Sequence, residues 1–205
     1  EMDGIELCQL LKNDIHTSHI PVILLTAKTT TENEFKGLQI GADAYVRKPF
    51  KLEILKMQLL NIHRHRTKLK EQFKREVILQ PSKVTVTSRD EQFLKKLVDF
   101  VEEHMNDGEF NVDALVKKMY ISRSRLYVKI KALTGQSTSE FIRTVRLKRA
   151  VQLLEESDYT IKEVMVMTGF NTASYFSKCF KQQFGIVPSE YVRKNNSLAD
   201  EKLVE

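Results

Sequence analysis

Residues 169–181 decide the fold, and they read Gly169-Phe170-Asn171-Thr172-Ala173-Ser174-Tyr175-Phe176-Ser177-Lys178-Cys179-Phe180-Lys181. Gly185 and the run Pro188-Ser189-Glu190-Tyr191 follow. Glycine has the backbone freedom that a tight turn needs, and asparagine is a favourable N-cap. Gly169 and Asn171 therefore predict a turn that leads into a helix, and Gly185 predicts the end of that helix.

A helix over 171–184 would have two chemically different faces. The inner face carries Phe176, Cys179, Phe180 and Gln183, and the outer face carries Ser174, Ser177, Lys178 and Lys181. Small polar and basic residues outside an apolar face suit a helix whose outer side enters a DNA groove. An ordinary amphipathic surface helix is the commoner origin of such a pattern.

The same pattern occurs a second time, earlier in the chain. Before the turns the offset is 49 residues, as for Val112 with Ile161; after them it is 50, as for Ser124 with Ser174, Leu126 with Phe176, Lys131 with Lys181 and Gly135 with Gly185. Repetition of one supersecondary unit is difficult to obtain by chance. It predicts two helix-turn-helix units whose helices 122–134 and 171–184 enter successive major grooves, one turn or ~34 Å apart.

Positive charge is concentrated around the first of these units. The net charge of the whole chain is +6. Residues 111–154 contain ten Lys or Arg and two acidic residues, whereas residues 155–195 contain five of each. A concentrated basic segment favours a polyanionic partner, although a basic solvated helix face gives the same count.

Several function classes find no support in the sequence. No apolar run approaches the ~20 residues of a membrane span, and no signal peptide opens the chain, which favours a cytoplasmic setting. Cys8 and Cys179 show neither a disulfide framework nor a metal spacing. Cys179 would point inward with no base beside it, so an enzyme with a reactive thiol is disfavoured. We expect no catalytic residue, no metal and no cofactor.

The first 66 residues alternate between short apolar runs and helical patterns. Ile20–Thr26 and Ala44–Val46 read as strands, and residues 3–11, 31–40 and the segment from Leu52 read as helices. Such alternation predicts a parallel α/β sheet.

A seam of apolar residues continues from Leu52 to Phe73 and is interrupted by Arg66. Two readings stay open: the first half of this helix packs on the sheet, or one continuous helix to about residue 75 pairs with its copy in a dimer. We place the connector to the next domain at about 77–90.

The peptides MDGIELCQLLK, HIPVILLTA and GADAYVRKPF resemble the second half of a two-component response-regulator receiver domain. The resemblance implies that Thr26 bonds a phosphoryl oxygen, that Lys48 forms an ion pair with it, and that Tyr45 is the switch aromatic. It also implies a cis peptide before Pro49. The phosphoacceptor Asp and the Mg²⁺-binding acidic pair belong to the first half of that family, so none is assigned in this chain and Mg²⁺ is expected only in an intact receiver.

The peptides SRSRLYVKIKALTG and VMTGFNTASYFSKCFKQQFGIVPSEYVRK resemble the AraC/XylS-type DNA-binding domain. The expected fold class is mainly α: a tandem helix-turn-helix domain of about seven helices, preceded by a long linker helix and a partial flavodoxin-like α/β receiver remnant. The expected domains are 1–66 (partial receiver), 67–90 (linker helix and connector), 91–195 (AraC-type) and 196–205 (disordered tail).

Within this domain Arg125 and Lys178 are the best candidates for reading base edges, because basic side chains can donate to guanine O6 and N7. Hydroxyl side chains that reach bases or phosphates form a second group: Ser124, Tyr127 and Ser174. Residues expected to contact phosphates are Arg123, Lys131, Lys181 and Arg146. A merely solvated charge is the alternative for each basic residue.

The order of receiver, linker and AraC-type domain resembles the C-terminal end of hybrid two-component regulators. The resemblance implies a transcription regulator at the output end of a phosphorelay, with double-stranded DNA as partner and a histidine kinase module in the parent protein. A homodimer through receiver and linker helix is expected, with RNA polymerase as a further partner and the parent's anchoring in the inner membrane left open. A protein-interaction module that docks through its helix-turn-helix units is the alternative function.

Overall fold

The computed structural model describes residues 2–27, 41–75, 88–156 and 159–202. The described chain is mainly helical and forms two compact units. The first unit comprises Glu1–Arg75, Gln80–Lys96 and Ser124–Gly135, and the second Glu76–Leu79, Leu97–Arg123 and Gln136–Glu205. Two elements are divided between them, because α5 (Ser88–Glu103) and α7 (Arg123–Thr134) each cross a boundary. The predicted helix at 31–40 and residues 77–87 of the predicted connector lie outside the described residues.

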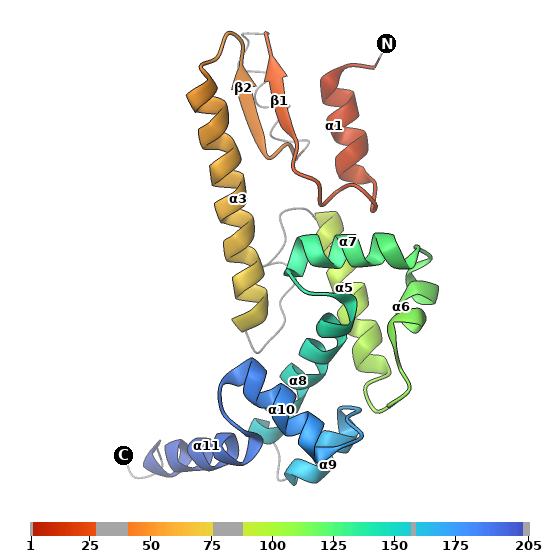
Figure 1. Ribbon diagram of the computed structural model, residues 1–205, viewed down its shortest axis with the longest axis vertical. Helices are drawn as coiled ribbons and strands as arrows, with labels where there is room; N and C mark the ends of the chain where they lie inside the picture. Colours follow the sequence, from red (N-terminus) through yellow and green to blue (C-terminus); the bar gives the residue numbers. More distant parts are fainter. Residues whose placement is uncertain (1, 28–40, 76–87, 157–158, 203–205) are drawn as a thin grey trace. The chain divides into compact units, whose positions relative to one another are not determined.

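The first unit begins with α1 (Gly4–Asn13), a two-stranded parallel sheet and the long helix α3 (Leu52–Arg75) (Figure 1). Asp3 and Glu6 form a capping box that starts α1. Strand β1 (Ile23–Thr26) pairs with β2 (Ala44–Arg47) in a register that sets Ile23 opposite Ala44. The expected α/β remnant and the helix to about residue 75 are therefore both present.

Asp43, next to β2, joins three segments of this unit. Its carboxylate lies 2.6 Å from the Lys12 ammonium of α1 and 2.9 Å from the Arg66 guanidinium of α3, and it accepts the Val22 N–H at 2.9 Å. Burial raises the pKa of Asp43, but the hydrogen bonds from Lys12, Val22 and Arg66 outweigh it and leave that pKa below its usual value. Arg66, which interrupts the leucine seam, thus has a packing role within the unit.

The seam of α3 is only partly covered in the described structure. Phe73 is buried, whereas Leu52 and Leu59 are 72% and 55% exposed. Ile54, Met57 and Leu60 are exposed as well. The first two turns of α3 therefore present apolar surface to solvent, and the helix packs on its own unit mainly through its later residues.

The second unit contains the end of α5, then α6 (Val112–Met119), α8 (Thr138–Glu156), α9 (Ile161–Met167), α10 (Ala173–Phe184) and α11 (Pro188–Lys202). With α7, this makes seven helices after residue 87 in the described chain, as the fold prediction required. In Figure 1, α9, α10 and α11 gather around α8. Their core combines aliphatic residues of α8 and α9 with Phe170, Phe176, Phe180 and Tyr191.

Two local expectations at the chain's helix ends need correction. Thr172, not Asn171, occupies the N-cap of α10, because Thr172 has the extended backbone of a cap and the helix begins at Ala173. Helix α11 continues to Lys202, so residues 196–202 are helical where a disordered tail over 196–205 was expected. Tyr120 has a left-handed backbone that closes α6.

Candidate DNA-binding surface

Helix α10 separates its two faces as the sequence predicted. Phe176, Cys179 and Phe180 are buried in the core of the second unit. Ser174, Lys178 and Lys181 are exposed on the other face, and Tyr175 is 49% exposed beside them. The aromatic core fixes the helix, because Phe176 makes edge-to-face contacts with Phe170 and Phe180. A rigid helix with a polar, basic outer face is suited to groove contact.

Helix α7, in the first unit, presents a comparable outer face. Ser124, Arg125, Tyr127 and Lys131 are exposed, while Leu126, Ile130 and Leu133 are buried. Val128, 53% exposed, adds an apolar group to the outer face. The four candidate residues on α7 are therefore on the surface where a partner can reach them.

Lys129, on the same helix, is buried. It follows Leu126 by three residues and precedes Leu133 by four, which places it on the apolar face. Its ammonium contacts the Asp90 carboxylate at 2.8 Å and donates to Ser18 Oγ at 2.7 Å and to the Ile15 carbonyl at 2.5 Å. The three- and four-residue spacing of Lys129 from Leu126 and Leu133 predicts that it is buried. A count of charges alone includes Lys129 in the basic surface.

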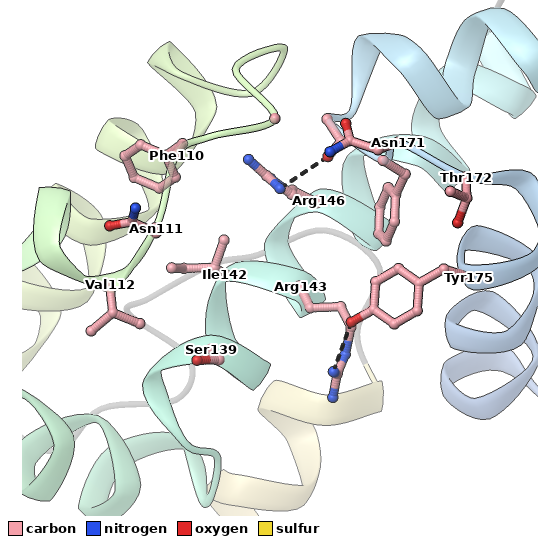
Figure 2. Close-up of a pocket in the computed structure, with 13 residues that line it drawn as sticks. Phe110, Asn111, Val112, Ser139, Ile142, Arg143, Arg146, Asn171, Thr172 and Tyr175 are labelled. Atoms are coloured by element: carbon pink, nitrogen blue, oxygen red, sulfur yellow. Dashed lines mark hydrogen bonds between the residues drawn. The ribbon is translucent and has the colours of Figure 1, made fainter.

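Arg146, another residue expected to contact a phosphate, is also buried, and that expected role stays a prediction. It is only 9% exposed, and its guanidinium donates to the Gly169 carbonyl at 3.1 Å (Figure 2). The same guanidinium donates to the Asp107 carbonyl at 2.7 Å. Burial lowers the pKa of Arg146, although Asp107 opposes that shift. Arg146 thus ties α8 to the segment that precedes α10.

Arg123, a predicted phosphate contact, lies at the start of α7 and forms an ion pair with Asp113 at 2.6 Å. Both side chains are 64% exposed, so solvent screens the pair and it adds little stability. A phosphate could compete with Asp113 for this guanidinium.

Of the predicted receiver residues, Thr26 and Lys48 lie at the carboxyl ends of β1 and β2, whereas Tyr45 is the second residue of β2, opposite Leu24. The Lys48 N–H donates to the Thr26 carbonyl at 2.6 Å, so these two residues are neighbours. Tyr45 and Lys48 line one pocket of about 330 Å³, which Thr26 does not line. The peptide between Lys48 and Pro49 is cis, as the resemblance implied.

Comparison with known proteins agrees with this arrangement. The family model of the response regulator receiver domain matches residues 1–60, and a helix-turn-helix domain model matches residues 115–194. The chain joins a receiver segment to an AraC-type helix-turn-helix domain. This confirms the family resemblance and the mainly α fold.

One relative matches nearly the whole chain and another matches about half of it. The chain is 44% identical over 191 residues to "Histidine kinase P4" of Formosa agariphila, a match that covers 93% of the chain and 14% of that relative. It is 30% identical over 98 residues to the "HTH-type transcriptional regulator MtrA" of Neisseria gonorrhoeae, which covers 48% of the chain and 31% of that relative.

Among solved structures, the DNA-binding domain of AdpA in complex with a target DNA is similar to about half of the chain, with 30% identity and a TM-score of 0.47. That match covers 51% of the chain and 93% of the AdpA chain. The chain spans only a small part of the length of the two curated relatives.

Proposed function

We propose that this chain is a sequence-specific DNA-binding transcription regulator and the output end of a two-component phosphorelay. Helices α7 and α10 are the reading helices of its two helix-turn-helix units and enter successive major grooves. The observation that carries this proposal is the division of α10, which exposes Ser174, Lys178 and Lys181 opposite a fully packed aromatic face. The relatives, which include a transcriptional regulator and a histidine kinase, support it.

In this proposal the surface residues divide by task. Arg125 and Lys178 read base edges, with Ser124, Tyr127 and Ser174 as supporting contacts. Arg123, Lys131 and Lys181 contact phosphates and set the register. The domain boundaries at 66, 90 and 195 remain part of the proposal, and the chain itself has no catalytic role and no cofactor. Both thiols are buried, and burial raises the pKa of Cys8, which favours unreactive cysteines.

The partners beyond DNA belong to the proposal as well. The exposed apolar residues at the start of α3 support a homodimer through the receiver segment and linker helix. The other proposed partners are a histidine kinase module in a longer parent protein and RNA polymerase. No helix among the described residues is long and apolar enough to cross a membrane. The cytoplasmic setting and an inner-membrane anchor of the parent stay proposals.

Salt dependence tests the proposal most directly. Duplexes that the chain selects from random DNA should bind with a log K that falls linearly with log salt, at a slope of ~−0.9 for each phosphate neutralised. Fluorescence anisotropy between about 50 and 200 mM salt measures that slope. A flat response would exclude DNA and favour the protein-interaction alternative.

A further inference from the structure

A pocket of about 320 Å³ lies within the second unit, between three segments that are distant in sequence. The segment that leads into α6 supplies Gly108, Phe110, Asn111 and Val112, the first turns of α8 supply Ser139, Ile142, Arg143 and Arg146, and the segment that leads into α10 supplies Gly169, Phe170, Asn171, Thr172 and Tyr175 (Figure 2). These are the entrance to the first helix-turn-helix unit, the connecting helix and the start of the second reading helix. The pocket therefore adjoins residues of both helix-turn-helix motifs.

The side chains that line this pocket include two arginines, Arg143 and Arg146, and no carboxylate. Arg143 lines it with a partly exposed guanidinium that lies 3.5 Å from the Tyr175 hydroxyl. Arg146 lines it from the buried side, and its Nε has no hydrogen-bond partner, although the side chain is only 9% exposed. Outside the lining, the negative charge of Glu140 raises the pKa of Arg143, and that of Asp107 raises the pKa of Arg146 against the effect of burial. A buried, unused donor beside a second guanidinium favours an anionic ligand.

The N-terminus of α10 adds to this field. Thr172 is its N-cap but makes no side-chain hydrogen bond to the helix. The first N–H groups of a helix have no partner within the helix, and the helix dipole places partial positive charge there. By contrast, the Asn111 side chain caps α6 by accepting the Asp113 N–H. Helix α10 thus leaves open donors at the pocket that α6 does not.

We propose that this pocket binds one phosphate group, and that its source is the DNA backbone between the two half-sites. The site rests on the proposed function, and it adds Arg143 and the start of α10 as contacts that fix the distance between the two reading helices on DNA. Phe110, Ile142 and Phe170 supply an apolar wall, which suits a deoxyribose attached to that phosphate. Phosphate groups commonly bind at helix N-termini with arginine beside them.

The test uses the full chain and a duplex it selects, in which each phosphate between the half-sites is replaced in turn by a neutral methylphosphonate. At one position, the methylphosphonate should lower the affinity of wild-type protein about tenfold. At that position the Arg143→Gln variant should bind the methylphosphonate duplex as well as it binds the unmodified duplex. Arg143→Gln should also reduce the slope of log K against log salt concentration by about one unit on the unmodified duplex. Arg149→Gln is the matched control, because Arg149 is exposed on α8 and does not line the pocket; it should behave as wild type at that position.

A second arm detects the site without DNA. Inorganic phosphate is titrated into wild-type protein while the N–H signals of arginine Nε are followed by NMR. A saturable shift of the Arg146 signal that is lost in Arg143→Gln would support a phosphate site in this pocket. If, in addition, no methylphosphonate position in the duplex responds to Arg143→Gln, the ligand of that site is free phosphate and not the DNA backbone.

If the chain binds DNA with steep salt dependence but neither arm responds, the pocket proposal is overturned and the proposed function stands. Absence of any DNA binding would instead reject the proposed function, and the phosphate titration would then decide the pocket alone.

Discussion

The ammonium group of Lys129 lies 2.8 Å from the carboxylate of Asp90, and both side chains are 2% exposed. Ser18 donates to the same carboxylate at 2.7 Å, and the Lys129 ammonium lies 4.7 Å from the centre of the Phe93 ring. Burial lowers the pKa of Lys129, whereas Asp90 raises it. Helix α7 is therefore held through its buried face by a charge that is paired inside the first unit.

Removal of Lys129 should strongly destabilise the first unit. Lys129→Ala leaves the Asp90 carboxylate buried without its ion pair, which typically costs about 3–5 kcal/mol. Lys131→Ala, on the exposed face of the same helix, should change the free energy of unfolding by less than about 0.5 kcal/mol. Urea denaturation of both variants measures the difference. If both variants changed the free energy of unfolding by the same small amount, the Lys129–Asp90 ion pair would contribute little to stability, and the Asp90 carboxylate would be hydrated in Lys129→Ala.

The two base-reading candidates should act at separate places on DNA. Arg125→Ala and Lys178→Ala should each weaken binding by about 1–3 kcal/mol and relax sequence preference at different positions. Binding titrations and footprinting of a selected duplex measure both effects. Lys56→Ala, on α3 of the receiver segment, is the control and should leave affinity unchanged. A single protected groove would show that one of the two helices has another task.

Gly169 and Gly185 offer a matched pair of substitutions. Both have a positive φ, of 73° and 84°, which costs a residue with a side chain roughly 1–2 kcal/mol. A Cβ at Gly169 would also meet the Met105 carbonyl oxygen at 2.4 Å, whereas at Gly185 nothing lies within 4 Å. Gly169→Ala should therefore lower the melting temperature far more than Gly185→Ala, since overpacking adds about 1–3 kcal/mol. Similar melting temperatures would show that the loop before α6 yields to the methyl group.

His19 should make the stability of the first unit depend on pH. Burial lowers the pKa of His19, and the charges of Lys129, Arg66 and Lys12 lower it further against the opposing charge of Asp90. Because the unfolded imidazole takes up a proton near its ordinary pKa of ~6.5 and the folded one only below that, stability is present above ~6.5 and is lost as pH falls through the folded pKa.

The loss should not exceed about 1.4 kcal/mol per pH unit from this one group. Melting temperatures at several pH values between 5 and 8 measure it. His19→Gln should flatten the acidic side of the curve, while His63→Gln, an exposed residue of α3, should leave it unchanged. An identical acid slope in His19→Gln would assign the loss to other groups.

Local patterns in the chain predicted most of the secondary structure. The period of the apolar residues predicts the inner faces of α7 and α10, and the 49- and 50-residue offsets identify the repeated unit without any tertiary contact. Such features depend on residues within a few turns of one another, so the sequence carries them directly. The cap of α10 was misplaced by one residue because Asn171 and Thr172 are both acceptable caps.

The basic residues show where sequence reasoning stops. Arg125, Lys178, Lys129 and Arg146 are equivalent in a count of charge, yet the first two are exposed and the other two are buried. The partners of Lys129 lie 39 to 114 residues away, in Asp90, Ser18 and Ile15, and those of Arg146 are backbone carbonyls of Asp107 and Gly169. No local rule specifies contacts at such separations.

The sequence by itself therefore determined the helix-turn-helix repeat, the mainly α fold and the faces of the two reading helices, because hydrophobic periodicity and turn residues act locally. Only the tertiary structure decided which cations are available to a partner, and it placed Arg143 and the open N-terminus of α10 around one pocket. The physical reason is that burial and ion pairing depend on which distant segments meet, and this is settled when the core packs.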